Sequence, residues 1–200
     1  MNPRKKNTRT ALKSVDQQEG PDRIEKADPS LEPLIMALSN HDDVTRVTAR
    51  HSLVAMGKAA VPSLTKAVKS KNRLTRWEAA KALGEIGDPQ SAPVLVKALE
   101  DEEFDVRWLA AIGLGGMNIK GLKPLLHALM EQGDSIWVRE GAHHVMHDLA
   151  KGELRKYLAP VLVALENNDT VEEVRRTALH ALEMLDKDHK ISDAWRHDIP

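Results

Sequence analysis

Apolar and small residues recur at helical spacing along most of this chain, and no segment alternates strictly between apolar and polar positions. In the segment 75–86 the residues at such spacing are Ala79, Ala82, Leu83 and Ile86. Shorter apolar segments that begin at a proline, such as 93–99, come between the longer ones. Proline suits the first turn of a helix, because its φ is already helical and its missing N–H has no partner there. The pattern therefore predicts an all-α chain in which short and long helices alternate.

Two unrelated residue types repeat with nearly one period. The frame Arg-x-x-Ala-x-x-x-Leu/Met steps by 30, 31, 32 and 36 residues, and its arginines are Arg46, Arg76, Arg107, Arg139 and Arg175. The prolines step by 29, 31, 31 and 36 residues, at Pro33, Pro62, Pro93, Pro124 and Pro160. A shared period of this length indicates stacked repeats, since one short helix pair cannot bury its apolar faces alone. We expect the arginines to run along the stack and to hydrogen-bond turn carbonyls or capping aspartates of adjacent repeats.

The segment Leu74–Gly115 resembles the short HEAT-like repeat of about 30 residues, the type named after phycobilin lyase subunits. The resemblance extends over roughly residues 30–186. It implies a right-handed α-solenoid of five HEAT-like helix pairs whose second helices line a groove. The expected repeats are about 30–57, 59–87, 90–118, 120–150 and 155–186. The polar ends, 1–29 and 187–200, are expected to be tails without stable structure.

Charge and composition narrow the possible partners. The first 13 residues carry five cations and no acid, whereas the net charge of the whole chain is −1. The remaining residues are therefore mildly acidic, which argues against nucleic acid as the partner. The chain has no cysteine, no apolar run long enough to span a membrane and no signal-peptide pattern. A cytoplasmic location is the expectation.

The position after each repeat arginine and the position four residues later should share one stripe on the second helices. These pairs are Val47 and His51, Trp77 and Lys81, Trp108 and Ile112, Glu140 and His144, and Arg176 and His180. Trp77 and Trp108 hold equivalent positions in adjacent repeats, so we expect them to form the centre of a partner-binding groove. The expected binding residues are Trp77, Lys81, Trp108, Ile112, Glu140 and His144. The alternative is that each indole covers the seam between two repeats.

One helix carries a weak candidate metal set. Glu140, His144 and His147 lie at i, i+4 and i+7, which puts one carboxylate and two imidazoles on one face. A single helix rarely completes a coordination sphere, and the neighbouring repeat offers Arg176, a cation. Deoxyhypusine hydroxylase is built from similar repeats and binds iron with His-Glu pairs just after the repeat arginine; here only Glu78 matches that pattern. We expect no metal and no other cofactor.

The pattern favours a non-catalytic HEAT-repeat scaffold or adaptor that binds a protein partner in the groove lined by the second helices. The resemblance leaves a second function open, a phycobilin lyase-like or chaperone-like factor acting on a tetrapyrrole-carrying protein. A metal-dependent oxidoreductase related to deoxyhypusine hydroxylase is the third. No nucleophile–base set is evident in the sequence, so an enzyme is the less favoured class.

Overall fold

The computed structural model describes residues 27–188, and these are helical, with connecting turns. The first helices of the pairs are α1 (Glu32–Ala37), α3 (Val61–Ala67), α5 (Ala92–Ala98), α7 (Ile119–Glu131) and α9 (Arg155–Glu166). The second helices are α2 (Asp43–Ala55), α4 (Arg73–Ile86), α6 (Phe104–Gly116), α8 (Ile136–Leu149) and α10 (Val171–Lys187). Short 3-10 turns precede four first helices: η1 (Pro29–Leu31), η2 (Gly57–Ala60), η3 (Pro89–Ser91) and η4 (Gly152–Leu154). The predictions for the basic cluster and for nearly all of both tails concern residues outside the described range.

Local side chains fix where the second helices begin. The side chains of Asp42, Asn72 and Ser135 each accept a hydrogen bond from the backbone N–H three residues later, at 2.9–3.2 Å. Such N-caps satisfy amide groups that the first helical turn leaves without partners. At the other end of α4, Gly87 has a φ of +66°, the left-handed conformation that terminates a helix. Polar turn residues thus cap α2, α4 and α8, whereas Glu103 at the start of α6 makes no side-chain cap.

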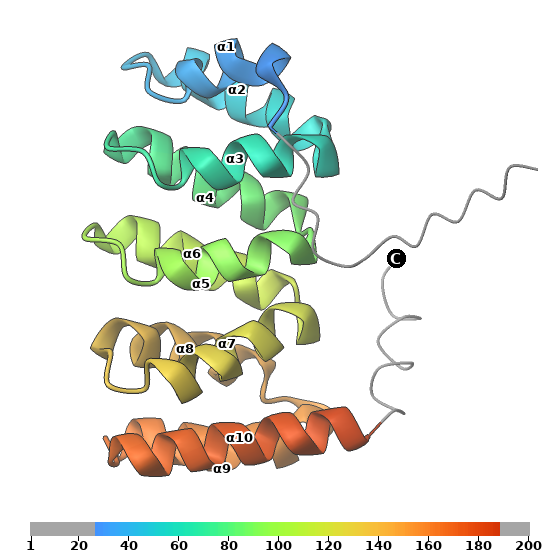
Figure 1. Cartoon of the computed structure of the whole chain (residues 1–200), viewed down its shortest axis with the longest axis vertical. Coiled ribbons are helices and arrows are strands. Elements are labelled where there is room, and N and C mark those ends of the chain that lie inside the picture. Colours follow the sequence, from blue (N-terminus) through green and yellow to red (C-terminus); the bar gives the residue numbers. More distant parts are fainter. Residues whose placement is uncertain (1–26, 189–200) are drawn as a thin grey trace, which may run out of the picture.

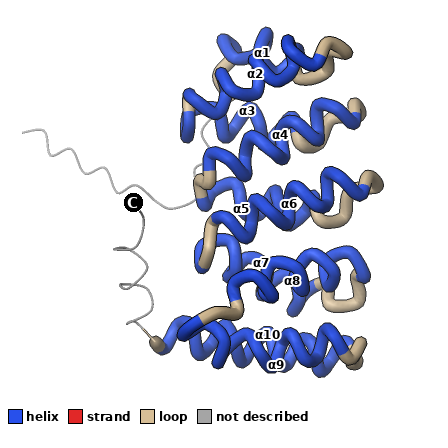
Figure 2. The backbone as a smooth tube through the Cα atoms, turned by 180° about the vertical axis from the view of Figure 1, so that it is seen from behind, coloured by secondary structure: helices blue, strands red, loops and turns tan. Residues whose placement is uncertain are grey.

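The helix pairs stack in two layers (Figure 1). The helices α1, α3, α5 and α7 form one layer, and α2, α4, α6 and α8 form the other, which faces the viewer in Figure 2. Each second helix of these four pairs packs on the second helices of its neighbours. The predicted α-solenoid of helix pairs is confirmed for the described residues.

The fifth pair exchanges the layers. Helix α10 packs against α7 and α9, so it lies in the layer of the first helices, as Figure 1 shows. The salt bridge from Lys123 of α7 to Asp186 of α10, 2.6 Å long, joins the two helices near their ends. The extra residues before α9, which include Gly152 with a φ of +52°, redirect the chain at this point. The face formed by the second helices therefore continues from α8 onto α9.

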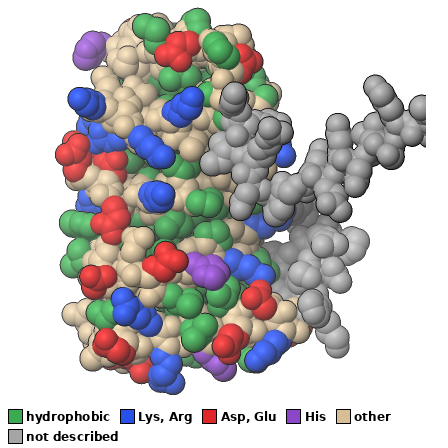
Figure 3. All heavy atoms as spheres, in the orientation of Figure 1, with side chains coloured by type: hydrophobic (Ala, Val, Ile, Leu, Met, Phe, Trp, Pro, Cys, Tyr) green, Lys and Arg blue, Asp and Glu red, His purple; other side chains and the backbone are tan. Residues whose placement is uncertain are grey.

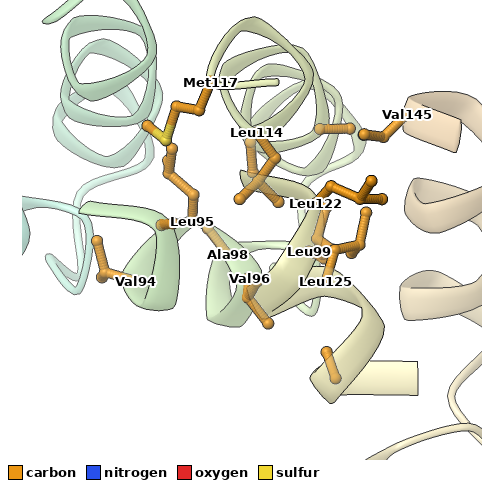
Figure 4. Close-up of a cluster of buried hydrophobic side chains, with 14 of the residues drawn as sticks. Val94, Leu95, Val96, Ala98, Leu99, Leu114, Met117, Leu122, Leu125 and Val145 are labelled. Carbon is orange, nitrogen blue, oxygen red and sulfur yellow. The ribbon is translucent and has the colours of Figure 1, made fainter. Parts of the chain in front are cut away.

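The core lies between the two layers and consists of small and medium aliphatic side chains (Figure 4). Leu95 of α5, Leu99 directly after α5, Leu114 of α6 and Leu125 of α7 are fully buried. The repeat alanines, such as Ala79 and Ala110, are also fully buried. Their small side chains allow neighbouring helices to approach closely. The core is thus continuous along the stack.

Four of the five repeat arginines form a ladder along the turns. Each donates from Nη1 to the carbonyl six residues earlier: Arg46 to Asn40, Arg76 to Ser70, Arg107 to Asp101 and Arg139 to Gly133. They also reach the next repeat, where Arg76 binds Asp101 at 2.8 Å and Arg139 donates to the carbonyl of Asp169 at 2.9 Å. The pKa of Arg76 is raised above its ordinary value. The main cause is its hydrogen bonding to Asp101, and the negative charges of Asp101 and Glu102 add to it. The expected structural role of the arginines is confirmed for these four, whereas Arg175 is exposed.

Candidate functional site

Large apolar side chains are exposed on neighbouring faces of α6 and α8. Phe104 and Trp108 of α6 are 58% and 43% exposed, and Trp137 of α8 is 40% exposed. Ile112 and Ile136, on the same two helices, are exposed as well. Exposed apolar side chains that gather in one place mark interaction sites more often than scattered ones do. This surface is therefore the candidate site.

A hollow of about 100 Å³ lies between α6 and α8, and we call it the aromatic hollow. Its lining consists of Leu99, Phe104, Arg107, Trp108, Ala111, Trp137, Glu140, Gly141 and His144. The wall is mostly apolar, and its polar groups come from three residues, Arg107, Glu140 and His144. An open, apolar cavity of this size can take one bulky side chain of a partner.

Aromatic contacts hold the indole of Trp108 in place. Its ring centroid lies 4.3 Å from that of His144 on α8 and 6.2 Å from that of Phe104, one turn earlier on α6. The Phe104 and Trp108 rings are nearly parallel, at 22°. Offset ring pairs of this kind add to the stability that burial gives. One face of the hollow is therefore organised before any partner binds.

Arg107 organises the opposite side of the hollow. Its guanidinium carbon lies 3.8 Å from the ring centroid of Trp137 and 5.8 Å from that of Phe104. Its Nη1 donates to the carbonyls of Asp101 and Glu102, at 2.7 and 3.1 Å. The repeat arginine thus has a second role here, because it anchors two aromatic rings to the turn before α6.

The floor of the hollow depends on Gly141. A Cβ atom at this position would lie 2.8 Å from Cδ2 of Leu99, which is closer than real contacts allow. The equivalent position carries Glu78 in the second repeat and Leu109 in the third. The glycine therefore lets Leu99 pack beneath α8 and leaves the space above it open.

A second, wider hollow lies on the other side of Trp137. It has a volume of about 610 Å³ and lies between the start of α8 and the end of α9. Its lining is Asp134, Ile136, Trp137, Arg139, Glu140, His143, Leu165, Glu166 and Asn168. Trp137 and Glu140 border both hollows, so the two form one surface that crosses the first turns of α8.

The structure brings together some of the predicted binding residues. Trp108, Glu140 and His144 line the aromatic hollow, and Ile112 lies one turn beyond Trp108. Trp77 and Lys81 form a separate pair, with the ammonium nitrogen 5.0 Å from the centroid of the indole ring. The Trp77 side chain is half-buried against the core. Its membership of a binding surface stays a prediction.

Two residues of the predicted stripe lie elsewhere. Arg176 and His180 belong to α10, which occupies the layer of the first helices. They line a separate hollow between α9 and α10, together with Pro160 and Val163. The expectation that the stripe continues onto α10, the second helix of the fifth pair, is wrong. It assumes that every pair keeps the same orientation.

The candidate metal residues are not gathered around a common point. His144 contacts the Trp108 ring, and His147 is exposed beside Asp148, with Nδ1 3.8 Å from Oδ1. Within residues 27–188, no group of three or more His, Asp or Glu side chains is placed to hold a metal ion. Glu78, the residue that matches the hydroxylase pattern, is fully buried and paired with Arg46 at 2.8 Å.

Sequence reasoning missed two residues of the site, Phe104 and Trp137. The sequence interval between each of them and the predicted stripe residues indicates that they share a helix face. Phe104 precedes Trp108 by four residues, and Trp137 precedes Glu140 and His144 by three and seven. A stripe that starts one turn earlier on each helix contains them both.

Stacked helix pairs that share one core and expose a lined groove define a helical-repeat protein of the α-solenoid class. The chain belongs to the HEAT repeat family, whose profile matches residues 31–115 and 92–183. No match is found among curated proteins. Among solved structures, the chain is similar to the crystal structure of an engineered protein, with 20% sequence identity and a TM-score of 0.37. That match covers 76% of this chain and 77% of the other.

In the part of the chain that the structure describes, no helix combines the length and the apolar character needed to cross a bilayer.

Proposed function

We propose that this protein is a non-catalytic, cytoplasmic HEAT-repeat scaffold that binds a protein partner through the aromatic hollow. The observation that carries the proposal is the exposure of Phe104, Trp108 and Trp137 around one cavity on neighbouring helices. Buried aromatic anchors contribute a large share of the binding free energy in protein interfaces. The aromatic hollow offers more such aromatic side chains around one cavity than the predicted centre at Trp77 and Trp108 does.

The organisation of the walls supports binding. Trp108 is held against His144, and Trp137 is held against Arg107, so neither indole needs to be ordered by the partner. A surface that is already ordered loses little conformational entropy on association. The rings also lie on helices, which hold a site more rigidly than loops do.

The lining of the aromatic hollow favours binding over catalysis. No hydroxyl, thiol or amine side chain that could act as a nucleophile is among its residues. The repeat length of about 30 residues supports the assignment to the short phycobilin-lyase-type HEAT repeats. The repeat type alone carries no reaction, however, because the same repeat serves unrelated functions.

The test is quantitative partner capture from an extract of the source cells, with the tagged full chain and the double variant Trp108→Ala, Trp137→Ala. We expect proteins that the unmodified chain retains to be depleted at least tenfold with the double variant, as for loss of two interface anchors. Mass spectrometry of the retained proteins measures the depletion.

Val44→Ala with Leu179→Ala is the matched control, because it removes two exposed apolar side chains that lie outside both hollows, and it should retain the same proteins as the unmodified chain. Helical circular dichroism should be the same for all three proteins. Equal retention by the double variant and the unmodified chain would remove the basis of the proposal.

A further inference from the structure

Three exposed carboxylates border the two hollows on either side of Trp137. Glu140 borders both hollows, and Asp134 and Glu166 border the wider one. Within the described residues, no cation pairs with Asp134 or Glu140, and Glu166 has only His143 nearby, at 3.5 Å. We call these three residues the acidic rim.

The two arginines of this surface donate in part to backbone carbonyls. Arg107 donates to two carbonyls of the turn before α6, and Arg139 donates to the carbonyls of Gly133 and Asp169. Part of each guanidinium is therefore engaged with backbone oxygens, whereas the carboxylates of the rim are open to solvent. The surface offers apolar walls and free acceptors.

Three basic side chains on the helices around this surface, Lys123, Lys156 and Arg176, are each paired with a carboxylate. On the face that Figure 3 shows, Lys and Arg side chains occur in both halves of the stack, with Asp and Glu side chains among them. Asp134 and Glu140 of the acidic rim have no such partner among the described residues.

We propose that the partner segment bound at this surface is a basic peptide in which bulky aliphatic side chains are flanked by lysine or arginine. This inference rests on the proposed function and specifies its partner. The aliphatic side chains enter the hollows on either side of Trp137, and the flanking cations meet the acidic rim. Complementary charge of this kind sets the choice of partner and the association rate.

The geometry also sets the spacing of the two aliphatic side chains. Neighbouring packed helices lie about 8–10 Å apart, and the two hollows are separated by the first turn of α8. A segment in the polyproline II conformation has three residues per turn and rises about 3.1 Å per residue, so side chains three residues apart lie on one face about 9 Å apart. The partner segment therefore has its aliphatic side chains about three residues apart.

The test uses three fluorescein-labelled peptides and the full chain, with binding measured by fluorescence anisotropy. The first peptide is Lys-Lys-Leu-Lys-Lys-Leu-Lys-Lys. The second replaces every lysine by glutamate, and the third replaces both leucines by serine. We expect the first peptide to bind at least tenfold more tightly than either of the others. Its affinity should fall as salt rises from about 0.05 to about 0.5 M, because salt screens exposed charges.

Two sets of variants separate the contributions of charge and apolar contact. Glu140→Gln with Asp134→Asn should weaken the first peptide about fivefold at low salt, the size expected for two exposed ion pairs. Trp108→Ala with Trp137→Ala should abolish measurable binding. As the matched charge control, Glu183→Gln changes an exposed carboxylate of α10 and should leave the affinity unchanged.

The possible failures are distinguishable. Tighter binding of the glutamate peptide, or an affinity that Glu140→Gln with Asp134→Asn leaves unchanged, overturns the inference of a basic partner but leaves partner capture by the two tryptophans intact. Displacement of the probe by a peptide of residues 1–17 at equal or lower concentration overturns it as well, since the chain's own basic segment is then the occupant. A dimer of the unmodified chain that sedimentation detects, and that is lost in the double tryptophan variant, also overturns the inference of a basic partner. A second copy of the chain is then the occupant. If the tryptophan variant changes neither peptide binding nor capture, the proposed function fails too.

Discussion

At the scale of single residues, Glu78 joins the first two repeats. Its carboxylate is fully buried, with Oε1 2.8 Å from Nε of Arg46 and Oε2 3.0 Å from Nε of Arg50. Arg50 is also buried and pairs with Glu85. A buried charge is tolerated only where opposite charges and hydrogen bonds compensate its lost hydration. The position that carries a metal ligand in the hydroxylase family thus carries a structural ion pair here.

Glu78→Gln should lower the free energy of unfolding by about 3 kcal/mol, because two arginines then lose their buried counter-charge. Urea denaturation followed by circular dichroism measures the change. Glu85→Gln is the control, since that carboxylate is partly exposed and its loss should cost about 1 kcal/mol. Equal losses for the two variants would contradict a dominant role of the buried carboxylate.

At the scale of helices, a glycine pair sets the distance between α4 and α6. A Cβ atom on Gly84 would lie 2.9 Å from Cα of Gly113, and one on Gly113 would lie 3.0 Å from Cα of Gly84. Glycine inside a helix costs about 1 kcal/mol relative to alanine. The close crossing explains why both positions are glycine, and it shows that Gly113 serves a helix contact.

Gly84→Ala should lower the free energy of unfolding by about 2 kcal/mol, because two helix backbones must separate to admit the methyl group. Gly116→Ala, at the end of α6, meets no atom within 4 Å and should raise it by up to about 1 kcal/mol. Thermal or urea unfolding of both variants measures the difference. A stabilised Gly84→Ala protein would show that the crossing has room for a methyl group.

At the scale of the whole molecule, stability should be distributed unevenly along the stack. Helix α6 packs between α4 and α8 in the middle of the stack, whereas α1 has six residues, none of them buried. In a solenoid each repeat is stabilised by its neighbours, so a terminal repeat with one neighbour opens more easily.

Amide hydrogen exchange should therefore be fastest in α1 and slowest in α4 and α6. Mass spectrometry of exchanged peptides, or NMR, measures this order in the full chain. Protection of α1 equal to that of α6 would show that the stack unfolds as one cooperative unit.

The candidate site could be predicted only in part. The stripe of Trp108, Glu140 and His144 follows from helical periodicity, which needs no knowledge of how the repeats meet. The contact of Trp108 with His144 and of Arg107 with Trp137 could not be predicted in the same way, because each joins two repeats. Such contacts depend on the distance and rotation between helices α6 and α8.

The sequence alone determined the repeat period, the helix pairs and the ladder of arginines. These features depend on the spacing of residues within one repeat, and that spacing recurs in the next repeat. The tertiary structure decided which aromatic rings share a cavity and where α10 lies. Both depend on how successive pairs pack, and the layers of the last pair are exchanged after the turn that contains Gly152. Local periodicity carries no information about that rotation, since it is set by the burial of apolar surface between pairs.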